Sequence, residues 1–289
     1  MHNKTLLLVD GMAAVYRAFY AIKNLKTSKG VPSNAIFGFV RMIDQLKKAW
    51  NPSHLVVVFD GGLPAERLEL VPDYKGNRSP KPDELRMQLD GINEYLEAAS
   101  VPSIRRDACE ADDIMATLAV DAADESVRVL LATHDKDLFQ LVNANTKIVP
   151  VTGKYEIMGC EEILIKTGVD PTQIVDWLAL IGDSADNIKG VPGVGPKTAT
   201  KLLTEYGTVE KLWPHINELH GNKLKESLGA SWDIVVRNQK MVKLYTELDG
   251  IPDWSGYSVA APQVGKLLRF YEKFEFHDFA RNLREPELF

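Results

Sequence analysis

The chain has 289 residues, of which 45% are hydrophobic, enough for one large domain or two ordinary ones with a real core. Two cysteines are too few for a disulfide framework, and no apolar stretch approaches the roughly 20 residues that a membrane-spanning helix needs. The net charge of −6 does not exclude a nucleic-acid partner, because a basic face can coexist with an acidic pocket.

The start of the chain does not resemble a signal peptide. Residues 1–4 are polar, and the apolar run that follows covers only residues 6–9. Together with the sparse cysteines, which fit a reducing compartment, this predicts a cytoplasmic protein without a membrane partner.

Three short apolar runs are expected to be buried strands, at residues 6–9, 55–59 and 129–132. Long helical patterns separate them, which predicts an α/β core with a mainly parallel central sheet. The runs end at or shortly before aspartates, at Asp10, Asp60 and Asp135. Because ligands gather beyond the carboxyl ends of parallel strands, we expect these acids to share one pocket.

Between the second and third of these runs, residues 64–82 contain four prolines and mixed charges without a sustained apolar face. We expect them to form a mobile excursion from the sheet rather than a core element. Two helices are predicted next, one from Pro82 and one from near Glu110. Their inward-facing residues recur at helical spacing: Leu85, Leu89, Ile92 and Leu96 in the first, Ile114, Leu118 and Ala122 in the second.

The strand signal disappears after about residue 168, and we place a domain boundary near 170, between residues 1–169 and 170–289. Asp170 and Pro171 are typical of a helix start. Pro196 and Gly207 bound another helix, with one apolar face that contains Ala199, Leu202, Leu203 and Tyr206. Further helical segments are expected at 209–219, 224–228 and 232–248.

Nine carboxylates lie at strand ends or helix starts: Asp10, Asp60, Glu110, Asp112, Asp113, Asp135, Asp137, Asp183 and Asp186. Two bare carboxylates about 4 Å apart repel by roughly 4 kcal/mol at an effective dielectric constant of about 20, so cations must neutralise such a pocket. Oxygen ligands without paired histidines or cysteines favour Mg²⁺ or Mn²⁺ over zinc. Any one pair of these acids is explained equally well by a helix N-terminus or a turn; the number of clusters favours a metal site.

The stretch GDSADNIKGVPGVGPKTATKLL, residues 182–203, sets Asp183 and Asp186 directly before a glycine-rich hairpin. Glycine amides and Lys197 are suited to holding phosphate. Acids beside such a loop are reasonable if they hold metal and the metal holds phosphate, because paired divalent ions activate water and stabilise the leaving oxygen of a phosphodiester. The hairpin then binds the same nucleic-acid backbone some nucleotides away.

Six blocks follow one another along the chain: LLLVDGMAAVYRAFYAI, VVVFDGG, YKGNRSPKPDEL, CEADDIMATLA, ATHDKDLFQLV and GDSADNIKGVPGVGPKTATKLL. In this order they closely resemble the 5′-nuclease family, which comprises flap endonucleases and the 5′→3′ exonuclease domain at the N-terminus of bacterial DNA polymerase I. The resemblance covers essentially the whole chain. Three positions depart from the family pattern without removing a carboxylate: Cys109, His134 and Lys189.

The resemblance implies a PIN-like core, a helical arch at about residues 64–90 that receives a single-stranded 5′ end, and a helix–three-turn–helix element on duplex DNA. It implies one metal region with Asp10, Asp60, Glu110, Asp112 and Asp113, and a second with Asp135, Asp137, Asp183 and Asp186. Lys75 and Arg78 would stabilise charge on the scissile phosphate, and Arg17 would contact phosphate nearby. The duplex would be held by Lys189, Gly190, Val191, Gly193, Gly195, Lys197, Thr198 and Lys201, with a K⁺ ion on main-chain carbonyls.

We therefore expect a monomeric, structure-specific 5′ nuclease that acts on DNA with two or more Mg²⁺ or Mn²⁺ ions, either fused to a DNA polymerase or cooperating with one. A PIN-like ribonuclease would share the acidic pocket, but the glycine hairpin argues against it. A non-catalytic DNA-binding module would gain nothing from concentrated negative charge. Lys75, Arg78 and Arg17 taken alone are equally consistent with solvated surface charges, and we expect Tyr16, Phe19 and Tyr20 to be core residues rather than base-stacking groups.

Overall fold

A five-stranded parallel sheet forms the centre of the protein, which we describe from a computed structural model of residues 4–123, 127–153 and 156–285. The first residues of the polar start and the last four of the chain lie outside the described residues. The strand order is β3-β2-β1-β4-β5, with β1 (Thr5–Asp10), β2 (His54–Phe59), β3 (Ser103–Arg105), β4 (Arg128–Ala132) and β5 (Thr146–Val149). The three strands predicted from apolar runs are confirmed as β1, β2 and β4.

The two remaining strands, β3 and β5, lie at the sheet edges and were not predicted. They are short, and in β3 both terminal residues are exposed, so neither carries the continuous apolar run of a strand buried on both faces. Central β1 is the opposite case: its register pairs Leu8 with Val56 of β2 and with Leu131 of β4, and all three side chains are buried.

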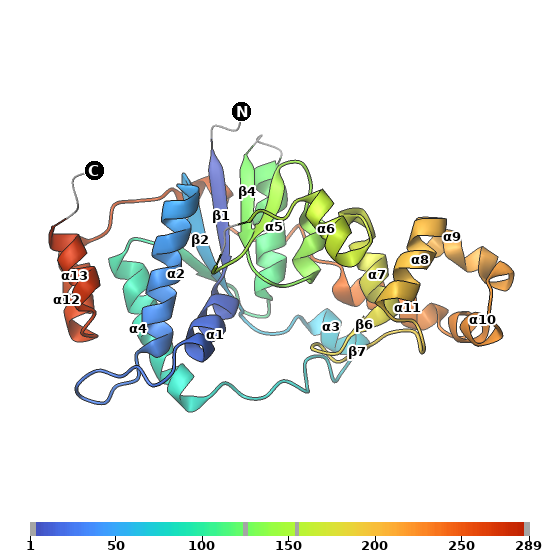
Figure 1. The fold of residues 1–289 in the computed structure, drawn as a ribbon, viewed down its shortest axis with the longest axis horizontal. Coiled ribbons are helices and arrows are strands. Elements are labelled where there is room, and N and C mark those ends of the chain that lie inside the picture. Colours follow the sequence, from blue (N-terminus) through green and yellow to red (C-terminus); the bar gives the residue numbers. More distant parts are fainter. Residues whose placement is uncertain (1–3, 124–126, 154–155, 286–289) are drawn as a thin grey trace.

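Side chains of β1 alternate between two apolar layers. Leu7 and Val9 belong to one layer, and Leu6 and Leu8 belong to the other. Figure 1 shows the helices that cover the two faces of the sheet. The first face is covered by α1 (Gly11–Ala21), α2 (Asn34–Trp50), α4 (Asp83–Ala98), α12 (Val264–Lys273) and α13 (His277–Arg284), and the second by α5 (Ala111–Ala123).

The second half of the chain is helical, as expected. Asp170 caps the helical start by accepting a hydrogen bond from the Thr172 amide at 3.0 Å, with Pro171 at the first position. The elements that follow are η2 (Pro171–Gln173), α7 (Ile174–Ile181), α8 (Pro196–Tyr206), α9 (Val209–Leu212), η3 (Trp213–Glu218), α10 (Asn222–Gly229) and α11 (Trp232–Val242), after the short α6 (Cys160–Thr167). One antiparallel pair, β6 (Gly182–Asp183) with β7 (Ile188–Lys189), interrupts them.

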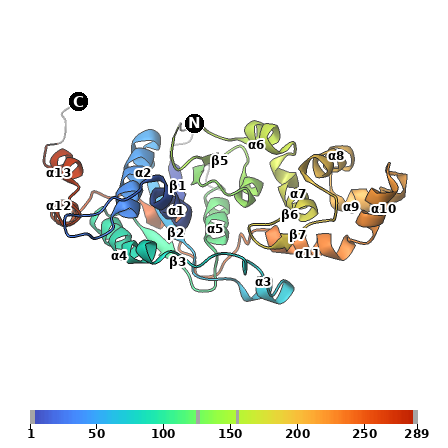
Figure 2. The same cartoon turned by 60° about the horizontal axis from the view of Figure 1, so that its bottom comes forward.

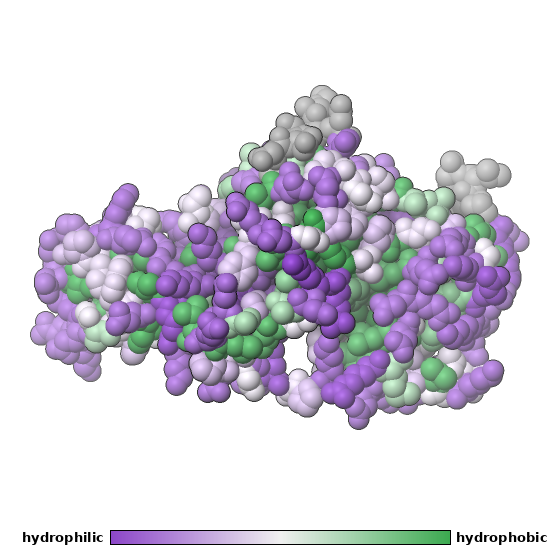
Figure 3. Space-filling view, turned by 180° about the vertical axis from the view of Figure 1, so that it is seen from behind, coloured by the Kyte–Doolittle hydropathy of each residue, from purple (hydrophilic) through white to green (hydrophobic). Residues whose placement is uncertain are grey.

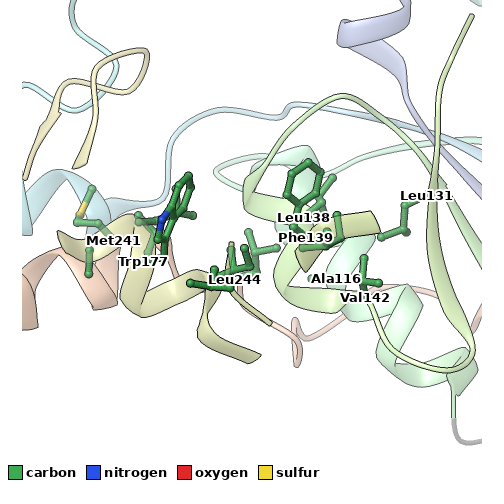
Figure 4. Close-up of a cluster of buried hydrophobic side chains, with 14 of the residues drawn as sticks. Ala116, Leu131, Leu138, Phe139, Val142, Trp177, Met241 and Leu244 are labelled. Carbon is green, nitrogen blue, oxygen red and sulfur yellow. The ribbon is translucent and has the colours of Figure 1, made fainter. Parts of the chain in front are cut away.

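The predicted helix at 232–248 is wrong in its last part. Helix α11 ends at Val242, because the backbone is extended at Lys243 and residues 243–248 turn back onto α5. One apolar cluster continues from the sheet into the helical half, and Leu244 of this turn belongs to it (Figure 4). The cluster contains Ala116, Leu131, Leu138, Phe139 and Val142 on the sheet side, and Trp177, Met241 and Leu244 on the other.

The chain finally returns to the sheet. The Gln263 amide donates to the Ala98 carbonyl at 2.9 Å, and Phe270 and Tyr271 of α12 are buried among the residues of α2 and α4. Residues 264–284 therefore lie on the sheet side of the molecule, far from α10 (Figure 1). Among the described residues, no helix is both long and apolar enough to span a bilayer.

Residues 64–82 leave the sheet as predicted, but part of this segment is packed against the rest of the protein. They contain helix α3 (Ala65–Leu70), which contacts α11, and two buried side chains, Arg67 and Tyr74. Figure 2 shows α3 beside α11 and β7. The following loop runs below α1 to α4 (Figure 1), and the view from behind shows an opening through the molecule in this region (Figure 3).

Candidate active site

The predicted carboxylates begin at the carboxyl end of β1, where Asp10 caps α1. Its Oδ1 accepts the Ala13 amide at 2.9 Å, and its Oδ2 accepts the Thr133 hydroxyl at 3.2 Å. Burial, together with the charges of Asp60 and Asp135, raises the pKa of Asp10 to about 6. Asp60 is exposed at the end of β2, and its carboxylate accepts the Ala111 amide at the start of α5. The strand-end acids thus share one region, as predicted.

A second group of acids is tighter. Carboxylate oxygens of Asp137, Asp183 and Asp186 lie within 4.8 Å of one another. These residues come from the start of η1 (Asp137–Leu141), from β6 and from the β6–β7 turn, so the group joins the sheet to the helical half. The Asp137 amide donates to Asp135 Oδ1 at 2.9 Å, which sets Asp135 beside them.

One oxygen of this group has no protein partner. Asp137 Oδ1 is buried and accepts no hydrogen bond within the described part of the chain. A buried polar atom without a partner costs about 1–3 kcal/mol, more if it is charged, and a bound cation would satisfy it. The set of oxygen ligands around it fits a hard divalent ion such as Mg²⁺ or Mn²⁺.

Asp112 and Asp135 connect the two groups electrostatically. Burial and the charges of Asp135 and Asp10 raise the pKa of Asp112 well above its usual range. Burial and the charges of Asp186 and Asp183 likewise raise the pKa of Asp135. Carboxylates of the two predicted metal regions therefore interact with one another, and we call the whole group the acidic pocket.

Lys75 and Arg78 reach this pocket from the turn after α3. The Lys75 ammonium contacts Glu110 and lies 3.6 Å from Asp186, and Arg78 bonds Asp186 at 2.5 Å. Burial would lower the pKa of Lys75, but the charges of Glu110 and Asp186 outweigh burial and raise the pKa, so the side chain is charged at neutral pH.

Two further groups at these acids were not predicted from the sequence. The Tyr74 hydroxyl donates to Glu110 at 3.2 Å, and the Lys136 ammonium lies 3.3 Å from Asp183.

The turn that carries Lys75 is fastened to the β6–β7 turn. The Lys75 amide donates to the Asp186 carbonyl at 3.1 Å, Asn77 donates to the Ser184 carbonyl, and Asn187 donates to the Asp73 carbonyl. Lys75 has a φ of 55°, a left-handed conformation that costs a non-glycine residue of the order of 1 kcal/mol and tends to occur at functional sites. The contacts on both sides hold the lysine in this conformation.

Asp113 does not face the pocket. Its carboxylate accepts both Nη atoms of Arg67, at 2.7 and 2.8 Å, and the Tyr245 amide at 2.9 Å. The structure thus brings eight of the nine predicted acids around the pocket and places Asp113 behind it. Arg67 was not singled out in the sequence, because an arginine in the mixed-charge stretch AERLEL carries no distinguishing pattern.

Arg17 and two tyrosines lie on α1, the helix that Asp10 caps. The charge of Arg17, after burial, contributes to lowering the pKa of His134, which precedes Asp135. The rings of Tyr16 and Tyr20 are parallel, with centroids 6.4 Å apart. The prediction that Tyr20 is a core residue is wrong: its side chain is 63% exposed, because it lies outside the buried face of α1.

The glycines of the hairpin fall into two kinds. A Cβ on Gly190 would lie 2.3 Å from the Ile181 carbonyl carbon, so this glycine permits a close approach of two backbones. A Cβ on Gly193 or Gly195 would meet nothing within 4 Å, so the loop is open at these two positions to an approaching group. Val191 is buried, Thr198 is half-buried, and the three lysines Lys189, Lys197 and Lys201 are exposed.

The fold and the acidic pocket together define a class of protein, a nuclease with an α/β catalytic core and a helical second part. A family model described as 5′-3′ exonuclease, N-terminal resolvase-like domain, matches residues 5–168, and a second, described as 5′-3′ exonuclease, C-terminal SAM fold, matches residues 169–264. The chain belongs to the 5′-3′ exonuclease family.

Individual proteins that are similar to this chain support the same family assignment. A 5′-3′ exonuclease of Aquifex aeolicus is 38% identical, over 97% of this chain and 95% of that protein. DNA polymerase I of Bacillus subtilis is 40% identical over 98% of this chain, which spans only 32% of the polymerase. Among solved structures, the T5 5′-exonuclease with bound zinc (TM-score 0.69, 24% identity, 98% of this chain and 99% of that one) and the catalytic core of Rad2 with DNA substrate (TM-score 0.67, 18% identity, 99% and 92%) share the fold.

Proposed function

We propose that this protein is a structure-specific 5′→3′ exonuclease and 5′-flap endonuclease that hydrolyses DNA phosphodiesters in replication and repair, with two or more Mg²⁺ or Mn²⁺ ions. The observation that carries the proposal is the group Asp137, Asp183 and Asp186, with its unsatisfied buried oxygen, directly beside Lys75 and Arg78. Clustered acids that adjoin two cations suit a reaction in which metal and protein share one phosphate.

Each part of the pocket has a distinct role in this proposal. Bound divalent ions supply an activated water and stabilise the leaving oxygen. The carboxylates around the pocket hold those ions, with Asp10, Asp60, Glu110 and Asp112 on one side and Asp135, Asp137, Asp183 and Asp186 on the other. Lys75 and Arg78 neutralise charge that develops on the scissile phosphate, and Arg17 contacts a neighbouring phosphate. The product keeps its phosphate at the 5′ end.

The substrate in this proposal is a junction between single-stranded and duplex DNA. The opening beside the loop after α3 (Figure 3) suits a single-stranded 5′ end, and the open rim of the hairpin suits duplex backbone, with K⁺ on its carbonyls. In this proposal the part of the chain before about residue 170 receives the 5′ end, and the hairpin after it holds the duplex. We further propose that the protein is a cytoplasmic monomer that works beside, or as the front of, a DNA polymerase; the DNA polymerase I relatives support this last point.

A labelled 5′-flap duplex tests the function directly. With Mg²⁺ or Mn²⁺ we expect cleavage at the junction and 5′-phosphorylated products, and with excess EDTA we expect none, because the acids alone have no means of activating water. A matched flap made of RNA separates the proposal from a ribonuclease. Wild-type rates in EDTA, or cleavage restricted to RNA, would contradict it.

The hairpin offers a second, independent test through Gly195. Its backbone is extended, with a φ of −100°, and a Cβ there meets nothing within 4 Å, so Gly195→Val should fold normally. The added side chain should nevertheless keep duplex phosphate away from the loop. We expect weaker binding to all duplex sequences alike, because phosphate contacts carry no base information.

Lys197→Glu should act in the same direction and flatten the salt dependence of binding by about one unit of log–log slope. Binding is measured by salt titration on a flap duplex in EDTA. Gly256→Val is the matched control, because a Cβ at Gly256 also meets nothing within 4 Å, in η4 (Trp254–Tyr257) beside β2. Equal losses in Gly195→Val and Gly256→Val would mean that the hairpin is not the duplex contact.

A further inference from the structure

Arg67 forms a buried junction behind the acidic pocket. Its side chain is 3% exposed, and its two Nη atoms are each used twice. Nη1 bonds Glu110 and Asp113, and Nη2 bonds Asp113 and the Lys243 carbonyl at 3.2 Å. One guanidinium therefore connects α3, the start of α5 and the segment that follows α11.

Tyr245 closes the same junction from the other side. Its ring lies against the Arg67 guanidinium, at 4.8 Å, and its amide donates to Asp113 at 2.9 Å. Its hydroxyl donates to Glu66 of α3 at 2.9 Å, and its carbonyl accepts from Thr117 of α5 at 3.3 Å. The ring contact with Arg67 and the backbone bonds to Asp113 and Thr117 hold residues 243–248 on α3 and α5, whereas the hydroxyl bond to Glu66 is exposed and adds little.

Stability alone is a weak explanation for this arrangement. A buried ion pair often contributes no more than apolar residues of the same volume, because both charges lose their hydration. Glu110, however, is shared: on its other side it accepts Lys75 and Tyr74 at the pocket. Glu110 is thus held between a structural arginine and a lysine of the candidate catalytic site.

Asp113 binds Arg67 on the side of α5 that faces away from the acidic pocket. It follows Asp112 directly, and neighbouring residues of a helix point about 100° apart, so only one of the two can face the pocket. Asp112 is the electrostatic neighbour of Asp10 and Asp135, and Asp113 holds Arg67. Asp113 therefore anchors the first turn of α5 to Arg67, while Asp112 in that turn and Glu110 just before it are directed to the acidic pocket.

We propose that Arg67 is a positioning residue that aligns Glu110 and the first turn of α5 for metal binding when the helical half is docked on α3. This inference rests on the proposed nuclease function. With a side chain only 3% exposed, Arg67 acts through Glu110 and Asp113 and not by contact with the substrate. A residue that orients metal ligands in this way typically changes metal affinity or activity 10- to 100-fold when it is replaced.

The test compares Arg67→Gln and Arg67→Lys with the wild type on a flap duplex. Lysine keeps the charge but cannot bond two carboxylates and a carbonyl in one plane, so both variants should behave alike. We expect the single-turnover rate at fixed Mg²⁺ to fall about 10- to 100-fold, the half-saturating Mg²⁺ concentration to rise, and DNA affinity in EDTA to stay unchanged. Amide hydrogen exchange without metal should speed up at 65–70, 111–117 and 243–248 but not in α2.

Tyr245→Phe is the matched control. It keeps the ring contact with Arg67 and the amide bond to Asp113, and it loses only an exposed hydrogen bond to Glu66. Its rate and Mg²⁺ dependence should match those of the wild type. If the Arg67 variants do not fold, Tyr245→Ala should show the same shifts in smaller degree. Folded variants with wild-type rate and Mg²⁺ dependence, or a rate that falls only with the folded fraction, would overturn the inference. A wild type that cleaves nothing would instead refute the proposed function, and hydrogen exchange would still decide whether Arg67 joins the three segments.

Discussion

Replacing Asp186 by asparagine should strongly slow cleavage while affinity for a flap duplex holds or rises. Asp186 is one of the three carboxylates whose oxygens lie within 4.8 Å of one another, and it also receives Arg78. Asparagine keeps the size of the side chain but offers a neutral oxygen, a poor ligand for a hard divalent ion. We expect the single-turnover rate to fall by about 10³-fold, the upper range for the loss of one electrostatic stabiliser.

Affinity should move the other way because the substitution removes negative charge next to the phosphate backbone. The substitution removes carboxylate repulsion but also the ion pairs with Lys75 and Arg78, so these opposing effects should leave the metal-free melting temperature little changed. Asp137→Asn should behave like Asp186→Asn, and here the buried, unsatisfied Oδ1 is the atom concerned.

Asp44→Asn is the control for both variants. Asp44 is also partly buried, and it accepts the Tyr95 hydroxyl at 3.2 Å on α2, away from the pocket. Its replacement should leave both rate and affinity at wild-type values. Binding is measured in EDTA and chemistry by single turnover in Mg²⁺. If Asp186→Asn weakened binding without slowing the chemical step, the acids would belong to the DNA contact and not to the metal site.

Lys75→Ala should lower the turnover rate by about 10²-fold or more with little change in affinity. The ammonium is held between Glu110 and Asp186 by a turn that is itself bonded to β6–β7, so its position is set before substrate arrives. A fixed charge at that place stabilises a phosphate whose charge increases in the transition state more than it stabilises the ground state.

The backbone at Lys75 does not complicate this substitution. Alanine meets the same cost as lysine at a φ of 55°, so the turn should persist. Arg78→Ala should have a smaller effect, because the Arg78 side chain is 52% exposed and less rigidly held. Lys266→Ala, which removes a lysine from an exposed pair with Glu97, is the control. A large loss of affinity at unchanged turnover would show that Lys75 only binds the DNA backbone.

Much of the fold follows from local pattern. The runs at 6–9, 55–59 and 129–132 are apolar on both faces because helices cover both sides of the sheet, and that double burial is what made them recognisable. The edge strands β3 and β5 lack this signature. The end of α11 could not be predicted from local pattern either. Residues 243–248 leave the helix and form hydrogen bonds with Arg67 of α3 and Asp113 of α5, which are distant in sequence.

Local sequence was enough to place acids at the strand ends, to set Asp183 and Asp186 before a glycine-rich hairpin suited to phosphate, and to bring Lys75 and Arg78 close together in the chain. These are properties of short segments, and spacing along the chain expresses them directly. Which acids meet depends instead on tertiary packing. Asp112 and Asp113 are adjacent residues of one helix, and their side chains point about 100° apart. Asp113 binds the buried guanidinium of Arg67 because α3 and residues 243–248 pack against that side of α5.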